Sequence, residues 1–323
     1  MAVDERSPLF LVSTGPAAAH ESPGHPERPD RVAAIQSRLD ATPELATLVR
    51  AEPVEVDAAA PETVHTAAHV ERVRSLAAHG GGWLEPDTYC RPGSFAAALR
   101  SVGAAAAAVD AVAGGRAAHA FSLSRPPGHH ATADAGMGFC LFNNAAIAVR
   151  RARGLGVGRV AVVDIDVHHG NGTEEIFWDD PSVLYVSLHQ WPLYPGTGPE
   201  TARGGPRAPG LTVNLPVPPG TTGDQWLERF DAGAAPAVEG FGPDLIVVSA
   251  GYDAHAHDPL ASLRLTEMTY AAVAERIASI CAGRDIGSVW LLEGGYDLPA
   301  LGGSVAATLL ALSGRHRMAG DGV

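Results

Sequence analysis

The sequence predicts an α/β fold: a single, mostly parallel sheet with helices on both faces. Two observations lead to this prediction. Short apolar runs rich in β-branched residues recur along the chain, and Ala-rich stretches of helical length separate many of them. Strands that alternate with helices usually pair in parallel, because each crossover helix returns the chain to the same edge of the sheet. The 323 residues, 46% of them hydrophobic, can bury a core of this size.

Seven segments are predicted as buried strands because each is a short apolar run. They are residues 10–12, 121–123, 160–163, 183–188, 211–215, 245–249 and 289–292. Six segments are predicted as helices because they are long enough and rich in Ala, the best helix former. They are residues 31–39, 95–112, 144–153, 225–238, 267–281 and 300–312.

The chain contains no internal repeat and no linker long enough to separate domains. We therefore expect one domain over residues 1–323, with a flexible tail at 314–323. The longest irregular stretch, the Pro- and Gly-rich residues 191–210, is the kind of segment that shapes a site in a compact enzyme.

Composition excludes several classes of partner. The 23 Lys and Arg against 36 Asp and Glu give a net charge of −13, and no basic cluster offsets it, so we expect no nucleic acid. Gly, Pro or charge interrupts every apolar stretch, and the acidic start lacks the features of a signal peptide, so we expect no membrane and a cytoplasmic location. The three cysteines are not closely paired, so any metal must use His and carboxylate ligands.

The most informative segment follows the strand predicted at 160–163. Asp164, Asp166 and His168 are spaced by two residues, so their side chains leave an extended chain on one face. Gly170 and Gly172 allow a tight turn behind them. An isolated Asp-x-His at a strand end is often only a hydrogen-bonded turn.

Three other predicted strands end in similar groups, which favours a site over a turn. Ligands bind outside the carboxyl ends of parallel strands, so these loops can converge on one point. Two Asp and one His form a donor set suited to catalytic Zn²⁺, and Fe²⁺ or Co²⁺ would also fit. A neighbouring His pair could supply the base and a Tyr could bind an oxyanion. The groups are His129 and His130 after residues 121–123, Asp253, His255, His257 and Asp258 after 245–249, and Glu293, Tyr296 and Asp297 after 289–292.

The groups described above lie within longer motifs that are spread along the chain. The motifs are Gly24-His-Pro-Glu-Arg-Pro-Asp-Arg31, Arg125-Pro-Pro-Gly-His-His-Ala131, Gly138-Phe-Cys-Leu-Phe-Asn-Asn144, Asp164-Ile-Asp-Val-His-His-Gly-Asn-Gly172, Val186-Ser-Leu-His189, Ser249-Ala-Gly-Tyr-Asp253, His257-Asp-Pro-Leu260 and Glu293-Gly-Gly-Tyr-Asp297. Taken together, these motifs resemble the zinc-dependent histone deacetylase and acetylpolyamine amidohydrolase family. The similarity extends over roughly residues 20–310, and the order and spacing of the motifs agree.

The resemblance implies the arginase/deacetylase fold, with one parallel sheet of about eight strands between helices. It places one Zn²⁺ per chain on Asp166, His168 and Asp258. It also implies a structural K⁺, bound by Asp164, Asp166 and Ser187 and by the backbone carbonyls of His168 and Leu188.

The resemblance further assigns the catalytic groups. His129 and His130 are the tandem histidines, Tyr296 stabilises the transition state, Asp164 supports His129, and Asn171 supports His130 as in class II enzymes. A carboxylate favours an imidazolium ion and an amide does not. We therefore hypothesise that His130 is the general base and that His129 stays protonated.

Substrate-binding residues follow from the same resemblance. Gly138, Phe139 and Tyr194 resemble the walls of an acyl-lysine tunnel, although most members have Phe at the position of Tyr194. Leu265 aligns with an acidic gatekeeper of some polyamine enzymes, which argues against strict polyamine specificity, and Asp87 could hold a cationic or peptide substrate at the rim.

One further arginine has two interpretations. Arg31 matches a residue that lines the acetate exit in relatives, but it could equally be a cation on the surface of a helix.

The expected function is hydrolysis of an N-acetyl amide with release of acetate. The expected partner is acetyl-lysine in a protein or an acetylated small amine, and the oligomeric state stays open. A non-catalytic acyl-amine sensor is an alternative, but a sensor should lack a ligand, a tandem histidine or the tyrosine, and all are present. An arginase-like ureohydrolase is a minor alternative, because it would need two metals and the motif here supplies one.

Overall fold

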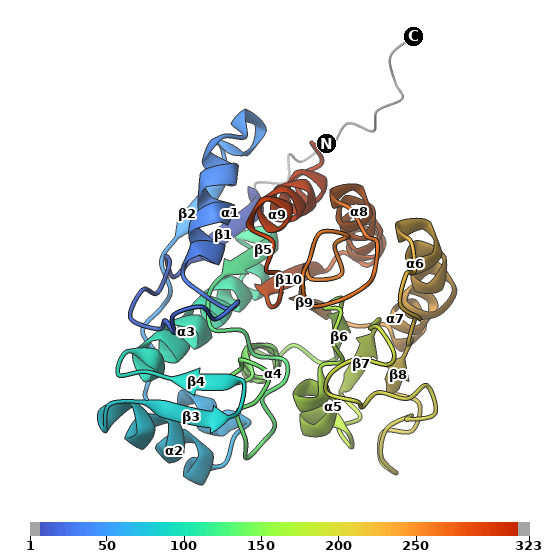
Figure 1. The fold of residues 1–323 in the computed structure, drawn as a ribbon. Helices are drawn as coiled ribbons and strands as arrows, with labels where there is room; N and C mark the ends of the chain where they lie inside the picture. Colours follow the sequence, from blue (N-terminus) through green and yellow to red (C-terminus); the bar gives the residue numbers. More distant parts are fainter. Residues whose placement is uncertain (1–6, 316–323) are drawn as a thin grey trace.

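The computed structural model describes residues 7–315, so most of the tail expected at 314–323 lies outside the described residues. Eight parallel strands form one sheet in the order β2-β1-β5-β10-β9-β6-β7-β8 (Figure 1). The predicted fold class is confirmed. The strands are β1 (Ser7–Ser13), β2 (Val49–Ala51), β5 (Ala117–Leu123), β6 (Val160–Asp164), β7 (Val183–Ser187), β8 (Thr212–Asn214), β9 (Leu245–Ala250) and β10 (Gly287–Leu292).

The register of the central strands brings their carboxyl ends to one level. Asp164 at the end of β6 pairs with Ser249 of β9, and Ser249 pairs with Leu291 of β10. Leu291 in turn pairs with Ser122 of β5. The loops that leave these four strands therefore begin side by side, which is the usual place for a ligand site in a parallel sheet.

Helices cover both faces of the sheet, and alternate residues of the central strands pack in one of two cores. Ala161 and Val163 of β6 belong to the core under α1, α6, α7, α8 and α9, whereas Val160 and Val162 belong to the core under α3, α4 and α5. Burial on both faces explains why the strands are continuous apolar runs. The helices are α1 (Asp30–Asp40), α2 (Ala67–Ala78), α3 (Ser94–Ala113), α4 (Asn144–Gly154), α5 (Asn171–Phe177), α6 (Gly223–Arg229), α7 (Ala235–Phe241), α8 (Glu267–Arg284) and α9 (Leu298–Leu312).

Helix α3 is the one helix among residues 7–315 that is long and apolar enough, by length and composition, to cross a membrane. In this fold 72% of its apolar window is buried inside the protein, where its alanines pack against β1 and β5. The Ala-rich run is therefore a core helix, as predicted from the sequence.

Several elements were not predicted. These are β2, α2, α5 and a separate antiparallel hairpin of β3 (Gly82–Glu85) and β4 (Thr88–Cys90). The helix predicted at 225–238 is divided into α6, a π-helical turn over Phe230–Ala234, and α7. Pro236 lies in the first turn of α7, and because Pro lacks an N–H it cannot continue a regular α-helical ladder.

Candidate active site

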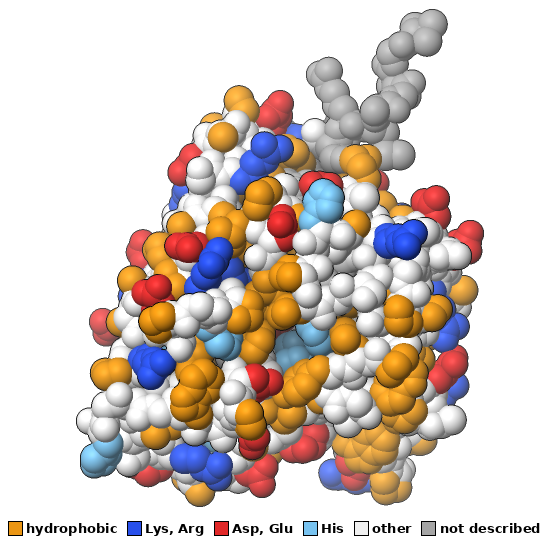
Figure 2. All heavy atoms as spheres, viewed as in Figure 1, with side chains coloured by type: hydrophobic (Ala, Val, Ile, Leu, Met, Phe, Trp, Pro, Cys, Tyr) orange, Lys and Arg blue, Asp and Glu red, His pale blue; other side chains and the backbone are white. Residues whose placement is uncertain are grey.

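The four loops at the carboxyl ends of β5, β6, β9 and β10 surround a cavity of about 240 Å³. Figure 2 shows it as a hollow with histidine at its base and hydrophobic and acidic side chains around it. Three further segments complete the wall: the β3–β4 hairpin, residues 138–139 and residues 193–194. The lining residues are Asp87, Pro127, His129, His130, Gly138, Phe139, Asp166, His168, Leu193, Tyr194, Leu260, Gly294 and Tyr296.

Two carboxylates and one imidazole meet at the base of this cavity. The ligand atoms of Asp166, His168 and Asp253 all lie within 4.8 Å of one another. Nδ1 of His168 is 3.1 Å from Oδ1 of Asp166 and 3.1 Å from Oδ2 of Asp253. Both carboxyl groups are buried. Buried charges of this kind need a partner, and a divalent cation suits a set of hard oxygen and imidazole donors.

Asp258, the third ligand predicted from the sequence, is not a member of this close cluster. Its Oδ1 accepts the Leu260 N–H at 3.0 Å, and its Oδ2 accepts the Tyr296 N–H at 2.7 Å. Burial and the nearby charge of Asp253 raise the pKa of Asp258 to about 7. Asp258 thus stays a predicted ligand, and Asp253, three residues after the end of β9, is an additional candidate.

The tandem histidines have different partners. The Nδ1–H of His129 donates to Oδ2 of Asp164 at 3.0 Å. Burial favours the neutral ring of His129, but the charges of Asp164 and Asp166 overcome this effect and raise its pKa to about 10. Burial and the positive charge of His129, 4.0 Å away between ring centres, hold the pKa of His130 well below its usual value. One ring of the pair is therefore charged at neutral pH and the other is neutral.

The orientation of Asn171 decides which nitrogen of His130 carries the proton. Oδ1 of Asn171 lies 2.8 Å from Nδ1 of His130, while the Asn171 amide nitrogen lies 3.4 Å from the sulfur of Met137. The amide oxygen accepts a hydrogen bond, so Nδ1 of His130 is the protonated nitrogen. Nε2 keeps its lone pair, which is the state that a general base requires.

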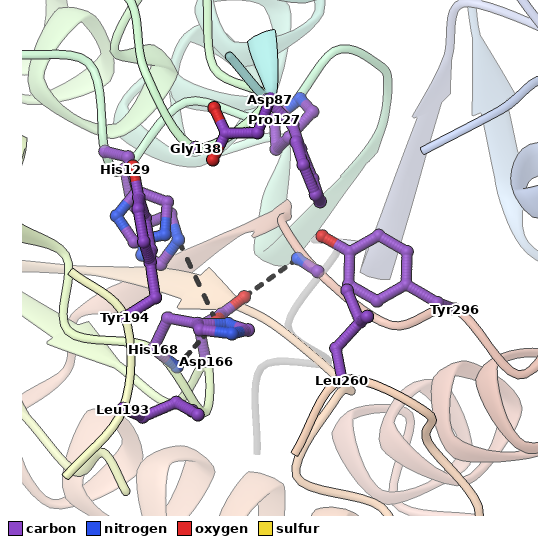
Figure 3. A pocket seen from close by; sticks show the side chains of 13 residues that line it. Asp87, Pro127, His129, Gly138, Asp166, His168, Leu193, Tyr194, Leu260 and Tyr296 are labelled. Carbon is purple, nitrogen blue, oxygen red and sulfur yellow. Dashed lines mark hydrogen bonds and ion pairs between the residues drawn. The ribbon is translucent and has the colours of Figure 1, made fainter. Parts of the chain in front are cut away.

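Tyr296 lines the cavity opposite the histidines, and its hydroxyl points into the cavity (Figure 3). Burial raises the pKa of its phenol well above the usual value, so the hydroxyl stays protonated and can donate. Its backbone is held by Asp258, and Asp297 caps helix α9 by accepting the Ala300 N–H at 2.9 Å. The segment that carries Tyr296 is thus fixed at both ends.

Glu293 was noted from the sequence but was given no role. The structure places its carboxylate under the tandem-histidine loop, where Oε2 accepts the N–H of Gly128 at 2.6 Å and that of His129 at 3.2 Å. The side chain is fully buried, and burial raises its pKa to about 7. A polar residue directly after a buried strand was the signal available in the sequence.

The predicted tunnel walls lie around the cavity. Gly138 and Phe139 both have positive φ, +54° and +69°, and a side chain at Gly138 would collide with the ring of His130. The Phe139 N–H donates to the hydroxyl of Thr88 at 3.0 Å, and that hydroxyl donates to Asp87 at 2.8 Å. These two hydrogen bonds connect Phe139 in the wall of the cavity to Asp87 at its rim.

Leu265 and Arg31 are both buried. Leu265 does not line the cavity: it is 1% exposed and packs in the core beside α8, because its backbone pairs with the segment around His255. Leu260 occupies the rim on this side. Arg31 is not a surface cation but is fully buried, with its guanidinium 4.9 Å from the ring centre of Tyr296.

The residues predicted to bind K⁺ also lie together. Asp164 and Ser187 are partners in the β6–β7 register, both fully buried, and the Leu188 N–H donates to the carbonyl of Asp164 at 3.1 Å. Asp166 and His168 follow directly on the same loop. The oxygen atoms of this group are of the kind that alkali cations bind, and the ion itself stays a prediction.

Comparison with known proteins gives several similarities. The Histone deacetylase domain family matches residues 25–312. The histone deacetylase-like amidohydrolase of Pseudomonas aeruginosa is 42% identical over 287 residues, which are 87% of this chain and 74% of that protein. Histone deacetylase 10, chloroplastic, of Oryza sativa subsp. japonica is 40% identical over 338 residues, covering 97% of this chain and 75% of that protein.

Two solved structures have the same fold. The HD domain of HDA15 superposes with a TM-score of 0.90 at 35% identity, covering 96% of this chain and 90% of that chain. An acetylpolyamine aminohydrolase from Burkholderia pseudomallei superposes with a TM-score of 0.84 at 30% identity, covering 95% and 99%. Sequence and structure therefore agree that the chain belongs to the histone deacetylase family.

Proposed function

We propose that the protein is a zinc-dependent deacetylase that hydrolyses the N-acetyl amide of a primary amine and releases acetate. The observation that carries the proposal is the cavity itself, in which a charged and a neutral histidine adjoin a buried Asp/His/Asp cluster and face a protonated tyrosine. Family membership supports amide hydrolysis as the reaction class. The substrate is acetyl-lysine in a protein or an acetylated small amine.

The donor set fits a divalent ion, because Asp166 and His168 with one further aspartate give hard oxygen and imidazole ligands in a buried site. When bound there, Zn²⁺ would polarise the amide carbonyl and make a water molecule more acidic. Fe²⁺ or Co²⁺ would suit the same donors.

Three side chains of the protein have different roles in moving protons and stabilising charge. Nε2 of His130 takes a proton from the attacking water, since its Nδ1 is already bound to Asn171. The hydroxyl of Tyr296 donates to the oxygen that becomes negative in the tetrahedral intermediate. His129 stays charged beside Asp164 and stabilises the same negative charge. The proton held by His130 returns to the departing amine.

We propose Asp258 as the third metal ligand and Asp253 as a buried carboxylate that adjoins the ligand set without binding the metal. The support for Asp253 is its Oδ2, which lies 3.1 Å from the same Nδ1 of His168 that faces Asp166, so its charge acts on that nitrogen. Asp258→Asn should then lose stoichiometric zinc, whereas Asp253→Asn should weaken zinc affinity about 10- to 100-fold. The opposite order would make Asp253 the ligand.

We also propose a structural K⁺ and a cytoplasmic location. A structural K⁺ would be held near Asp164 and Ser187, which are buried side by side in neighbouring strands. A cytoplasmic location is supported by the cysteines, since Cys90, Cys140 and Cys281 are all free and buried.

Turnover of a substrate panel tests the proposal. The purified, zinc-loaded protein should release acetate from acetyl-lysine peptides or from acetylated polyamines, and the His130→Ala variant should do so about 1,000-fold more slowly. Relatives include both a protein named as an amidohydrolase and a structure named as an acetylpolyamine aminohydrolase, so both substrate types belong in the panel. Tight binding of these amides without turnover would instead support an acyl-amine sensor.

A further inference from the structure

Glu27 lies outside the cavity, in the segment between β1 and α1, and its carboxylate is enclosed by two arginines. The Nε–H of Arg125 donates to Oε1 at 2.7 Å and the Nη2–H donates to Oε2 at 2.6 Å, which is a bidentate pair. Nη1 of Arg31 lies 3.4 Å from Oε1. All three side chains have no measurable exposure. Ion pairs with this geometry and burial are strongly directional.

Arg125 begins the loop that carries the tandem histidines. It stands two residues after the end of β5, and its bond to Pro126 is cis. Besides Glu27, its guanidinium donates to the carbonyl oxygens of Ala17 at 3.0 Å and His20 at 2.6 Å. The start of the histidine loop is therefore fastened to the segment that contains Glu27.

Arg31 reaches the loop that carries the tyrosine. Its Nε–H donates to the carbonyl of Gly295 at 2.7 Å, and its Nη2–H donates to the carbonyl of Glu293. The same guanidinium lies over the ring of Tyr296. Arg31 thus holds the backbone on both sides of Gly294 and contacts the tyrosine side chain.

The charges around Glu27 show why its carboxylate matters. The nearby Tyr89 hydroxyl, 3.2 Å from Oε2, is neutral, because burial raises its pKa. His20, 3.4 Å from Oε2, is driven toward its neutral form, because burial lowers its pKa. The single negative charge of Glu27 is therefore shared by two buried guanidinium groups. Without it, two desolvated cations would repel each other, and leaving buried charges unpaired is strongly unfavourable.

We propose that Glu27 is a positioning residue of the deacetylase reaction, whose carboxylate sets the placement of the histidine loop relative to the tyrosine loop through Arg125 and Arg31. This inference rests on the proposed function, because the two loops carry the proposed base and oxyanion donor. A displacement of about 1 Å between such groups can lower a rate about 100-fold.

The first experiment compares Glu27→Gln, a neutral variant of the same shape, with Glu27→Asp, which keeps the charge. Glu27→Gln should lower kcat about 100-fold while KM changes less than about threefold and zinc content stays the same. Glu27→Asp should recover part of kcat. The matched control is Asp180→Asn. Asp180 lies just before β7, far from the cavity, and its Oδ2 is 2.8 Å from Nη1 of Arg150. Removing this ion pair should leave kcat unchanged.

A double-mutant cycle with Tyr296→Phe separates positioning from folding. If Glu27 acts through the tyrosine loop, the effect of Glu27→Gln on kcat should shrink to less than about tenfold in the Tyr296→Phe background. A loss of folded protein would instead lower kcat by the same factor in both backgrounds. Where Glu27→Gln does not fold, the cycle is run with Glu27→Asp.

Two results would overturn the role of Glu27 and leave the deacetylase proposal standing. One is a wild-type kcat in folded, zinc-loaded Glu27→Gln. The other is an equal reduction of kcat by Glu27→Gln in the wild-type and Tyr296→Phe backgrounds. A wild-type protein without turnover on any amide would overturn the deacetylase proposal together with this inference. The two failures are therefore distinguishable in one set of assays.

Discussion

Two buried histidines at opposite ends of one strand differ in charge. His119 lies near the start of β5 and His129 lies on the loop that follows its end, and both are almost fully buried. Burial lowers the pKa of His119 to about 4, so it is neutral beside Ser288. Burial acts in the same direction on His129, yet the carboxylates of Asp164 and Asp166 raise its pKa to about 10.

The difference shows what the carboxyl edge of the sheet adds to ordinary burial. A histidine in the body of the sheet behaves as a polar core residue, whereas one at the edge meets the acidic side chains that follow β6 and β9. The edge can therefore hold charged groups out of water because each has an opposite partner. Substitutions at the carboxyl edge and in the body of the sheet test this difference.

The largest effect is expected within the tandem pair. His130→Ala should lower kcat about 1,000-fold, because it removes the proposed base, and His129→Ala should also reduce kcat but leave the base in place. Steady-state kinetics on an acetyl-lysine peptide measure both. Near-normal turnover by His130→Ala would contradict the assignment of the base.

Asp164→Asn should make the ring of His129 neutral, like the ring of His119. Without the carboxylate, burial dominates, the pKa of His129 falls, and kcat should drop about 100-fold as the positive charge is lost. Nitrogen chemical shifts of labelled histidine report the charge directly. The idea fails if His129 in the variant is still doubly protonated at pH 8.

Asn171→Asp should give His130 a partner like that of His129. A carboxylate beside His130 raises its pKa, so the neutral, active form is reached only at higher pH. The acid limb of the kcat/KM profile should therefore move up by about one pH unit or more. An unchanged profile would show that His130 is not the titrating base.

The last prediction concerns the free energy of unfolding rather than activity. The folded pKa of His119, about 4, is below its unfolded value near 6.5, so the unfolded state binds more protons between these values. Stability from this residue is present above pH 6.5 and is lost as pH falls toward 4, by up to about 3 kcal/mol. His119→Asn should flatten the decline in unfolding free energy in urea titrations between pH 6.5 and 4. Parallel curves for the two proteins would argue against it.

The sequence predicted the central elements because their pattern is strong. Strands such as β6 and β9 are buried on both faces and appear as continuous apolar runs. Strand β2 was missed because it has three partly or fully exposed residues, and the β3–β4 hairpin because its strands are only three or four residues long. Segments this short do not show a hydrophobic periodicity from which a strand can be predicted.

The site was predictable where ligands follow a strand at fixed spacing and less so where they lie on a longer loop. Asp166 and His168 are two residues apart beyond β6, so their convergence could be expected. Asp253 and Asp258 both lie on the loop after β9, and only the folded backbone shows which of them contacts His168. The prediction that Leu265 lies at the rim was wrong for the same reason, because the loop after β9 returns this residue to the core.

Metal content measured together with turnover shows whether a bound divalent ion is responsible for the activity. Mass spectrometry of the purified, active protein should find about one divalent ion per chain, chelation should remove both the ion and the activity, and added Zn²⁺ should restore both. Full turnover by protein that holds no stoichiometric ion would rule out a metal-dependent reaction.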